Sequence, residues 1–293
     1  MPEDRTDSPF FHLPVLPEQV LDGLQIKAGG RYLDATVGGG GHSLLLLQAM
    51  PDVEIVALDQ DLQAIAAAKA RLAEFDPRVT FHHTNFSRFD PKELRFDGIL
   101  ADIGVSSTQL DQGQRGFSFR QEAPLDMRMD ETQALTAEEI VNYWDEKAIA
   151  DTLYEYGEER LSRRIARRIV EKRPFSTTTE LAWEIAGAYP PKARHGRIHP
   201  ATRTFQALRI AVNGELKVLE AFLAAAPDWL KPEGRLAIIS FHSLEDRIVK
   251  YAFRGDERLQ IVTKKPLVAS QLEVQENKRS RSAKLRVAER KST

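Results

Sequence analysis

A regular alternation of short apolar segments with helical segments is the feature that most restricts the fold of this chain. It runs from about residue 15 to residue 101. Strands that alternate with helices form βαβ units, which build a parallel sheet covered by helices, so the alternation predicts an α/β protein. The expected strands are Arg31–Asp34, Glu54–Asp59, Val79–His82 and Phe96–Asp102, with helices at Ser43–Met50 and Leu62–Phe75.

The alternation stops after residue 110 and returns after residue 211. The sequence in between shows helical stretches and no convincing strand, and prolines stand at several of the helix borders. We therefore expect one sheet domain made of residues 1–110 and 212–293, with an all-helical domain inserted at residues 111–211. The expected helices of the insertion are Ala137–Trp144, Lys147–Tyr156, Glu158–Lys172, Thr179–Ala188 and Ala201–Asn213; a helix at Leu216–Leu230, a turn at Lys231–Gly234 and a strand at Arg235–Phe241 follow it.

Four consecutive glycines, Gly38–Gly41, join the first expected strand to its helix. Glycine lets the backbone turn tightly and approach a ligand, and the helix N-terminus offers unpaired N–H groups. Asp59 ends the second expected strand, where an acid in this fold accepts hydrogen bonds from ribose hydroxyls. Loop and acid together predict an adenosine-containing cofactor, either NAD or S-adenosylmethionine. A plain turn and a helix-capping acid are the alternatives.

Three features favour S-adenosylmethionine. Asp34 precedes the glycines, where its carboxylate could hold the cationic amino-acid end of the cofactor. The pattern G-x-G-x-x-G that serves a pyrophosphate is incomplete, because Ser43 stands at its third glycine position. The helix, turn and strand of residues 216–241 look like the late part of a class I methyltransferase. The predicted fold class is a class I S-adenosylmethionine-dependent methyltransferase (Rossmann-like) domain with an inserted all-helical domain.

Asp102–Ser107 follows the fourth expected strand and so lies at the carboxyl edge of the sheet, where open sheets bind ligands. An amine that receives a methyl group needs a hydrogen-bond acceptor to orient its N–H groups, and Asp102 could supply one. Such positioning lowers a barrier by about 7–11 kcal/mol in favourable cases. Asp102 could instead cap a loop or contact the cofactor. His242 and Asp246 follow the later strand, and His242 is a second catalytic candidate, with a structural role as its alternative.

The charges are divided unevenly along a chain whose net charge is only −2. Residues 1–157 hold 13 basic and 27 acidic residues, whereas residues 158–293 hold 28 basic and 16 acidic residues, a split that indicates a polyanionic partner. A tail at residues 278–291 has seven basic residues and one acidic residue. Each contact with a single-stranded phosphate would lower the slope of log K against log salt by roughly 0.7. The alternatives are a solvated helix face and a mobile tail. The predicted RNA contacts are Arg160, Arg163, Arg164, Arg167 and Arg203.

Several classes of protein are excluded by what the sequence lacks. Without cysteine, the chain forms no disulfide, thiolate metal site or cysteine nucleophile. Its start, Met1–Ser8, is acidic and polar rather than a signal peptide, and no apolar run approaches the ~20 residues that span a bilayer. We expect a soluble, cytoplasmic protein with no membrane partner, and we predict no metal ligands.

Long motifs spread over nearly the whole chain resemble the MraW-type 16S ribosomal RNA (cytosine-N4)-methyltransferases. The resemblance implies transfer of a methyl group from S-adenosylmethionine to N4 of a decoding-centre cytidine in the 16S rRNA of the small ribosomal subunit. It also implies that the inserted helical domain recognises the substrate. The motifs are Gly38–Ser43, Asp102–Ser107 with Gln109-Leu110, Arg115–Phe119, Pro124–Asp130, Tyr156–Arg160, His199–Gln206 and Ser240–Lys250.

The same resemblance implies a set of cofactor contacts, carried over position by position. Phe86 would stack against adenine, with an ordinary place in the core as the alternative, and His42 would act through its place in the loop rather than as a base. The implied contacts are Gly40, Gly41, His42, Asp59, Phe86, Asp102 and Gln109.

The loop after the fourth strand departs from a pattern common among amino-methyltransferases. Many carry Asp/Asn-Pro-Pro-aromatic there and stack the aromatic ring on the flipped base, whereas this chain has Asp102-Ile-Gly-Val. Phe117, Phe119 or Phe241 could replace that ring, and the sequence does not choose among them. The target amine has to be unstacked, which costs less in unpaired RNA. The general base is open, and none is needed if water takes the proton.

Three other functions compete with this interpretation. A methyltransferase of proteins or small molecules would be active without RNA and insensitive to neutralising the arginines of residues 160–168. A non-catalytic RNA-binding or ribosome-assembly factor that kept the fold would not bind the methyl donor. An NAD dehydrogenase would bind nicotinamide.

Overall fold

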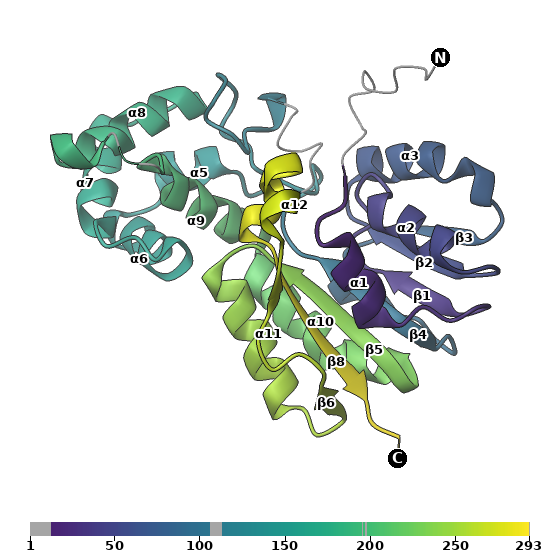
Figure 1. Ribbon diagram of the computed structural model, residues 1–293. Helices are drawn as coiled ribbons and strands as arrows, with labels where there is room; N and C mark the ends of the chain where they lie inside the picture. Colours follow the sequence, from purple (N-terminus) through teal and green to yellow (C-terminus); the bar gives the residue numbers. More distant parts are fainter. Residues whose placement is uncertain (1–12, 106–112, 195, 197, 293) are drawn as a thin grey trace. The chain divides into compact units, whose positions relative to one another are not determined.

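The computed structural model describes residues 13–105, 113–194, 196 and 198–292 and shows two compact units (Figure 1). The sheet unit combines Met1–Thr108 with Leu216–Thr293, and the helical unit comprises Gln109–Glu215. The helical unit is thus inserted between the two chain segments of the sheet unit. In the described part of the chain, no helix is both long and apolar enough to span a membrane.

One sheet organises the sheet unit. Its strands are β1 (Arg31–Asp34), β2 (Glu54–Asp59), β3 (Val79–His83), β4 (Phe96–Asp102), β5 (Leu230–Ser240), β6 (Leu259–Ile261), β7 (Leu267–Val268) and β8 (Lys284–Arg290). They lie in the order β3-β2-β1-β4-β5-β8-β6, with β7 paired to β8. Strands β1 to β5 are parallel, and β8 runs antiparallel to β5 and β6. This arrangement confirms the predicted Rossmann-like class I methyltransferase fold.

Helices cover both faces of this sheet. Successive side chains of a strand point to opposite faces, so each strand contributes apolar side chains to both of them. The helices are α1 (Pro17–Leu24), α2 (Gly41–Ala49), α3 (Leu62–Arg71), α10 (Glu215–Trp229), α11 (Ser243–Gly255) and α12 (Gln271–Glu276), with short 3₁₀ turns η1 (Ala73–Phe75), η2 (Phe86–Arg88) and η5 (Lys278–Ser282). In β1, Tyr32 packs in the cluster that includes α1, α2 and α3, whereas Leu33 packs in the cluster that includes α10 and α11.

The parallel register brings three aspartates to one edge of the sheet. Asp34 pairs with Ala57 of β2 and Leu100 of β4, so these strands end at similar heights. Asp59 is the last residue of β2 and Asp102 the last residue of β4. All three carboxylates therefore lie at the carboxyl edge, where open α/β sheets bind their ligands.

The predicted basic tail is wrong for residues 284–290, which form β8 in the interior of the sheet. Leu285 and Val287 are fully buried, and Arg286 is also buried, with its Nε 2.6 Å from Oδ1 of Asp246. The alternating pattern Lys-Leu-Arg-Val is typical of a strand, whereas the number of basic residues is typical of a tail. Strand β8 thus explains part of the basic charge as structural.

The helical unit contains α5 (Ala137–Tyr143), α6 (Glu146–Gly157), α7 (Ser162–Lys172), α8 (Thr178–Ala188) and α9 (Ala201–Asn213), with 3₁₀ turns η3 (Gly113–Arg115) and η4 (Pro191–Ala193). The helix predicted over residues 158–172 begins only at Ser162. Glu158 adopts a left-handed conformation, with φ of 48°. The buried Glu159 then accepts the N–H of Leu161 at 2.8 Å and the hydroxyl hydrogen of Tyr189. A corner fixed by a buried carboxylate therefore replaces the first turn of the predicted helix.

Candidate active site

The glycine loop after β1 is held by the carboxylate of Asp34. Its Oδ2 accepts a hydrogen bond from the Ser43 hydroxyl at 2.6 Å, and its Oδ1 accepts one from the Thr36 N–H at 3.2 Å. Gly40 has φ of 77°, and a Cβ there would lie 3.3 Å from the Cα of Ala68 in α3. Glycine is required at this position both by the left-handed backbone and by the close approach to α3.

Asp59 lies beside the same loop. Its Oδ2 accepts a hydrogen bond from the Gly38 N–H at 2.9 Å, and its Oδ1 accepts one from the Asp61 N–H at 2.9 Å. Burial raises the pKa of Asp59 to about 6. Each carboxylate oxygen has a second lone pair, so Asp59 can hold the loop and still accept a hydrogen bond from a ligand hydroxyl.

His42 and Asp102 contribute unused polar atoms at this edge of the sheet. His42 is buried in the first turn of α2, and its Nε2 lies 3.6 Å from Oδ2 of Asp102, beyond hydrogen-bond distance. Both ring nitrogens of His42 and Oδ1 of Asp102 are buried without a hydrogen-bond partner among the described residues. Because an unsatisfied buried polar group costs about 1–3 kcal/mol, these atoms are suited to a polar ligand.

Thr36 is a positioning residue that sequence reasoning missed. Its Oγ1 accepts a hydrogen bond from the Asp102 N–H at 2.7 Å, which ties the start of the loop after β4 to the loop after β1. Thr36 lies in Asp34-Ala-Thr-Val-Gly, at the start of the glycine loop, and this position is the sequence feature that indicates a role in the site.

The remaining predicted cofactor contacts differ in how far the structure describes them. Gly40 is the N-cap of α2 and Gly41 its first residue. Phe86 follows β3 in η2, and its partly buried ring meets Phe222 of α10 edge-on, with ring centroids 4.9 Å apart. This contact accounts for Phe86 as a core side chain, and its stacking on adenine stays a prediction. Gln109 lies outside the described residues.

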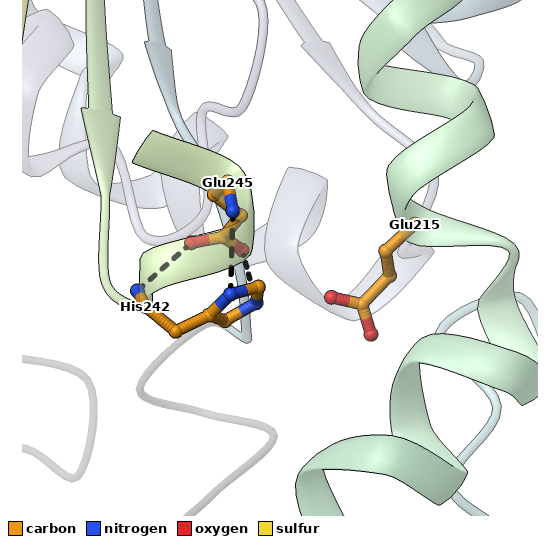
Figure 2. A group of neighbouring side chains, drawn as sticks. All are labelled: Glu215, His242 and Glu245. Atoms are coloured by element: carbon orange, nitrogen blue, oxygen red, sulfur yellow. Dashed lines mark hydrogen bonds and ion pairs between the residues drawn. The ribbon is translucent and has the colours of Figure 1, made fainter. Parts of the chain in front are cut away.

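His242, the second catalytic candidate, caps α11 (Figure 2). Its Nδ1 accepts the Glu245 N–H at 3.4 Å, and Oε2 of Glu245 accepts the His242 N–H at 3.2 Å. This reciprocal capping box accounts for the histidine, and its catalytic role stays a prediction. Glu215, also drawn in Figure 2, is the last residue of the helical unit and pairs with Arg209 of the same unit through hydrogen bonds of 2.7 and 2.8 Å.

The predicted RNA contacts are exposed arginines of the helical unit. They are Arg160 in the corner before α7, Arg163, Arg164 and Arg167 on α7, and Arg203 on α9. Arg167 Nε lies 3.6 Å from Oε1 of Glu146. Arg160, Arg163 and Arg164 make no ion pair with any other residue that the structure describes. Their charge is therefore available to a partner.

Known proteins resemble this chain along nearly its whole length. The model of the MraW methylase family matches residues 9–291. A Synechococcus elongatus protein named ribosomal RNA small subunit methyltransferase H is 62% identical over 97% of this chain and 96% of its own length. A Nostoc protein of the same name is 61% identical over 97% of this chain and 94% of its own. A solved structure of an rRNA methylase from Streptococcus thermophilus is 12% identical, covers 96% of this chain and 100% of that chain, and has a TM-score of 0.42.

Proposed function

The chain belongs to the MraW methylase family, and from that premise we propose that it methylates N4 of a decoding-centre cytidine in the 16S rRNA of the small ribosomal subunit. The methyl donor is S-adenosylmethionine. The observation that carries the proposal is the group of unused polar atoms of His42 and Asp102 at the sheet edge, beside the glycine loop. Relatives about 60% identical are named ribosomal RNA small subunit methyltransferase H, which supports the substrate. A reaction on small ribosomal subunits would take place in the cytoplasm.

Residues of the sheet unit fit the donor. Gly38–Gly41 would let the backbone approach it, and Asp59 would accept hydrogen bonds from its ribose hydroxyls. His42 and Asp102 would contact it with the polar atoms that have no hydrogen-bond partner among the described residues. When bound, S-adenosylmethionine would supply an electrophilic methyl group, whose bond to the sulfonium sulfur breaks on transfer and leaves its electron pair on sulfur as a neutral thioether. The residues present therefore match the chemistry of the donor.

Asp102 would orient the acceptor. Its carboxylate can accept a hydrogen bond from the exocyclic amine of cytosine. This hydrogen bond polarises the N–H bond and so raises the electron density on the nitrogen. The nitrogen has a proton to lose once its new bond to carbon has formed, and Asp102 or water takes it. Thr36 keeps Asp102 in place through its backbone N–H.

Small ribosomal subunits from a strain that lacks this methyltransferase test the proposal. The purified protein is incubated with labelled donor, and the label is mapped by nucleoside mass spectrometry. We expect label on N4 of one cytidine of the 16S rRNA. Label on another base or on ribosomal protein would contradict the proposed substrate, and donor binding with no label on the subunit would contradict catalysis.

The exposed arginines are proposed to bind the phosphates of this RNA. Replacing Arg163 and Arg164 together by glutamine should lower subunit affinity and flatten the slope of log K against log salt by roughly 0.7 for each phosphate that the variant no longer binds. Affinity measured across a salt series reports the slope. Lys147→Gln, which removes an exposed charge already paired with Asp151 in the same unit, is the matched control. An unchanged slope in the double variant would place the RNA elsewhere.

Donor binding should weaken below about pH 6. Asp59 accepts ribose hydroxyl hydrogens best as a carboxylate, and burial raises its pKa to about 6. Affinity should therefore fall by about tenfold for each pH unit below that value and level off above it. The free energy of unfolding changes in the opposite sense. A carboxyl group whose pKa is raised on folding lowers this free energy as pH increases from about 4 to about 6.

Calorimetric titration of the protein with S-adenosylmethionine across this pH range measures the profile. Asp59→Asn should bind weakly at every pH, because its amide accepts through only one oxygen. A wild-type affinity that stays constant through about pH 6 would rule out Asp59 as the ribose acceptor.

A further inference from the structure

Phe241 leaves the sheet beside the loop that follows β4. β4 and β5 are parallel neighbours in which Asp102 pairs with Ile239, and the Ile103 N–H donates to the Ile239 carbonyl at 2.9 Å. Phe241 comes directly after the end of β5, just as Ile103 comes directly after the end of β4. The two segments therefore emerge together at the carboxyl edge that carries Asp102.

Gly104, in the loop after β4, lies beside the ring of Phe241. Gly104 has φ of 119°, a conformation that side chains other than hydrogen disfavour. A Cβ built on it would meet, within 4 Å among the described residues, only Cδ2 of Phe241, at 3.6 Å. The loop backbone thus passes the ring with no side chain between them. The ring also packs against the core cluster that contains Leu285, yet it stays partly exposed.

The backbone of Phe241 is held by a hydrogen bond to α11. Its N–H donates to Oε2 of Glu245 at 2.8 Å, and this carboxylate is buried, with 1% of Glu245 exposed. The same oxygen accepts the N–H of His242 in the capping box of α11 (Figure 2). An aromatic ring that the core and α11 hold in advance loses little conformational entropy when a flat ligand packs on it.

We propose that Phe241 stacks on the cytosine whose amine Asp102 orients, an inference that rests on the proposed function. A base drawn out of its helix loses its stacking neighbours, and an aromatic side chain replaces them. Phe241 then sets the plane of the base, and Asp102 sets the rotation of the base within that plane. This division explains how the loop Asp102-Ile-Gly-Val dispenses with an aromatic residue of its own: the ring comes from the end of β5.

The two other phenylalanines that could take this role are already in contact with side chains of the helical unit. Phe117 is only 9% exposed, and the guanidinium of Arg115 lies 6.0 Å from its ring centroid. Phe119 packs against His199 and Phe205, with centroids 4.7 and 4.8 Å away. Both rings belong to the helical unit, whereas Phe241 belongs to the unit that carries Asp102.

Kinetics with variants of the full chain test the assignment on small subunits that lack the methyl group. Phe241→Leu keeps an apolar side chain but removes the π-face, and we expect kcat/KM for subunits to fall about tenfold. Phe241→Tyr keeps the face and should stay within about twofold of wild type. Tyr251→Leu, which removes an exposed aromatic ring from α11, is the matched control. The donor Kd and the thermal unfolding midpoint of each variant are measured in parallel.

Photo-crosslinking supplies a readout independent of turnover. Subunits are reconstituted with 5-iodocytidine at the cytidine that the wild-type protein methylates, and irradiation joins this base to an aromatic ring stacked on it. We expect the crosslinked peptide to contain Phe241 and the crosslink to disappear in Phe241→Leu. A crosslink to Phe117 or Phe119 would overturn the assignment.

Two further outcomes would overturn it as well. One is a Phe241→Leu variant as active as wild type. The other is a fall in the activity of Phe241→Leu accompanied by a comparable fall in donor affinity, since the ring would then only support the fold. Failure of the wild-type protein to methylate cytosine would instead contradict the proposed function, so the two failures are distinguishable.

Discussion

Deleting residues 284–293 should abolish the cooperative folding of the sheet unit. Strand β8 lies between β5 and β6, and each residue from Arg235 to Ser240 has a partner on it. Its removal would expose the backbone edge of β5 and the apolar side chains that Leu285 and Val287 cover, and open edges and apolar patches drive aggregation. The truncated chain should show no cooperative unfolding transition of this unit in urea.

A point substitution tests the same strand without shortening the chain. Val287→Asp places a carboxylate in a fully buried position, which should lower the free energy of unfolding by about 3 kcal/mol or more. Val268→Asp makes the same change at an exposed residue of β7 and should shift the free energy of unfolding by at most about 0.5 kcal/mol. A truncated protein that unfolds like wild type and only binds RNA more weakly would restore the interpretation of this segment as a basic tail.

The contrast between β8 and the earlier strands shows what the sequence can predict about this fold. β1, β2 and β4 have the predicted bounds, because each contains two to four consecutive apolar residues followed directly by a terminal aspartate. In β8 only alternate positions are strongly apolar, and the charges between them, such as Arg286, find partners on distant elements. Local composition therefore resembled that of a tail, and only long-range pairing decides that the segment is a strand.

The candidate site also combines features that the local sequence predicts with contacts that it does not. The glycine loop and Asp59 lie next to each other as the pattern indicates, since the loop follows β1 and Asp59 ends the adjacent parallel strand β2. The approach of His42 to Asp102 and the hydrogen bond from the Asp102 N–H to Thr36 join segments far apart in the chain. Such contacts depend on sheet register, which a single sequence does not reveal residue by residue.

Asp102→Asn should slow methyl transfer by roughly 10²–10³-fold, the effect of removing one well-placed electrostatic contact in an active site. The substitution keeps the size of the side chain and leaves the backbone N–H free to donate to Thr36, so the loop should stay in place. It removes the negative charge that favours the developing positive charge on the amine. It also replaces an acceptor oxygen with an N–H₂ group, which would face the N–H groups of the substrate.

Single-turnover rates on small subunits, with a parallel measurement of donor Kd, separate the two roles that Asp102 could have. If it orients the acceptor, the rate falls at saturating donor while the donor Kd changes little. If the whole effect appears in the donor Kd, Asp102 is a cofactor contact only. Asp97→Asn is the matched control: it makes the same change in the same strand β4, but its carboxylate is bound to Lys231 and to the Arg31 N–H near the start of β1, at the opposite edge of the sheet. Because Asp97 lies away from the loops that carry the site, its variant should transfer methyl groups at the wild-type rate even if it unfolds at a lower temperature.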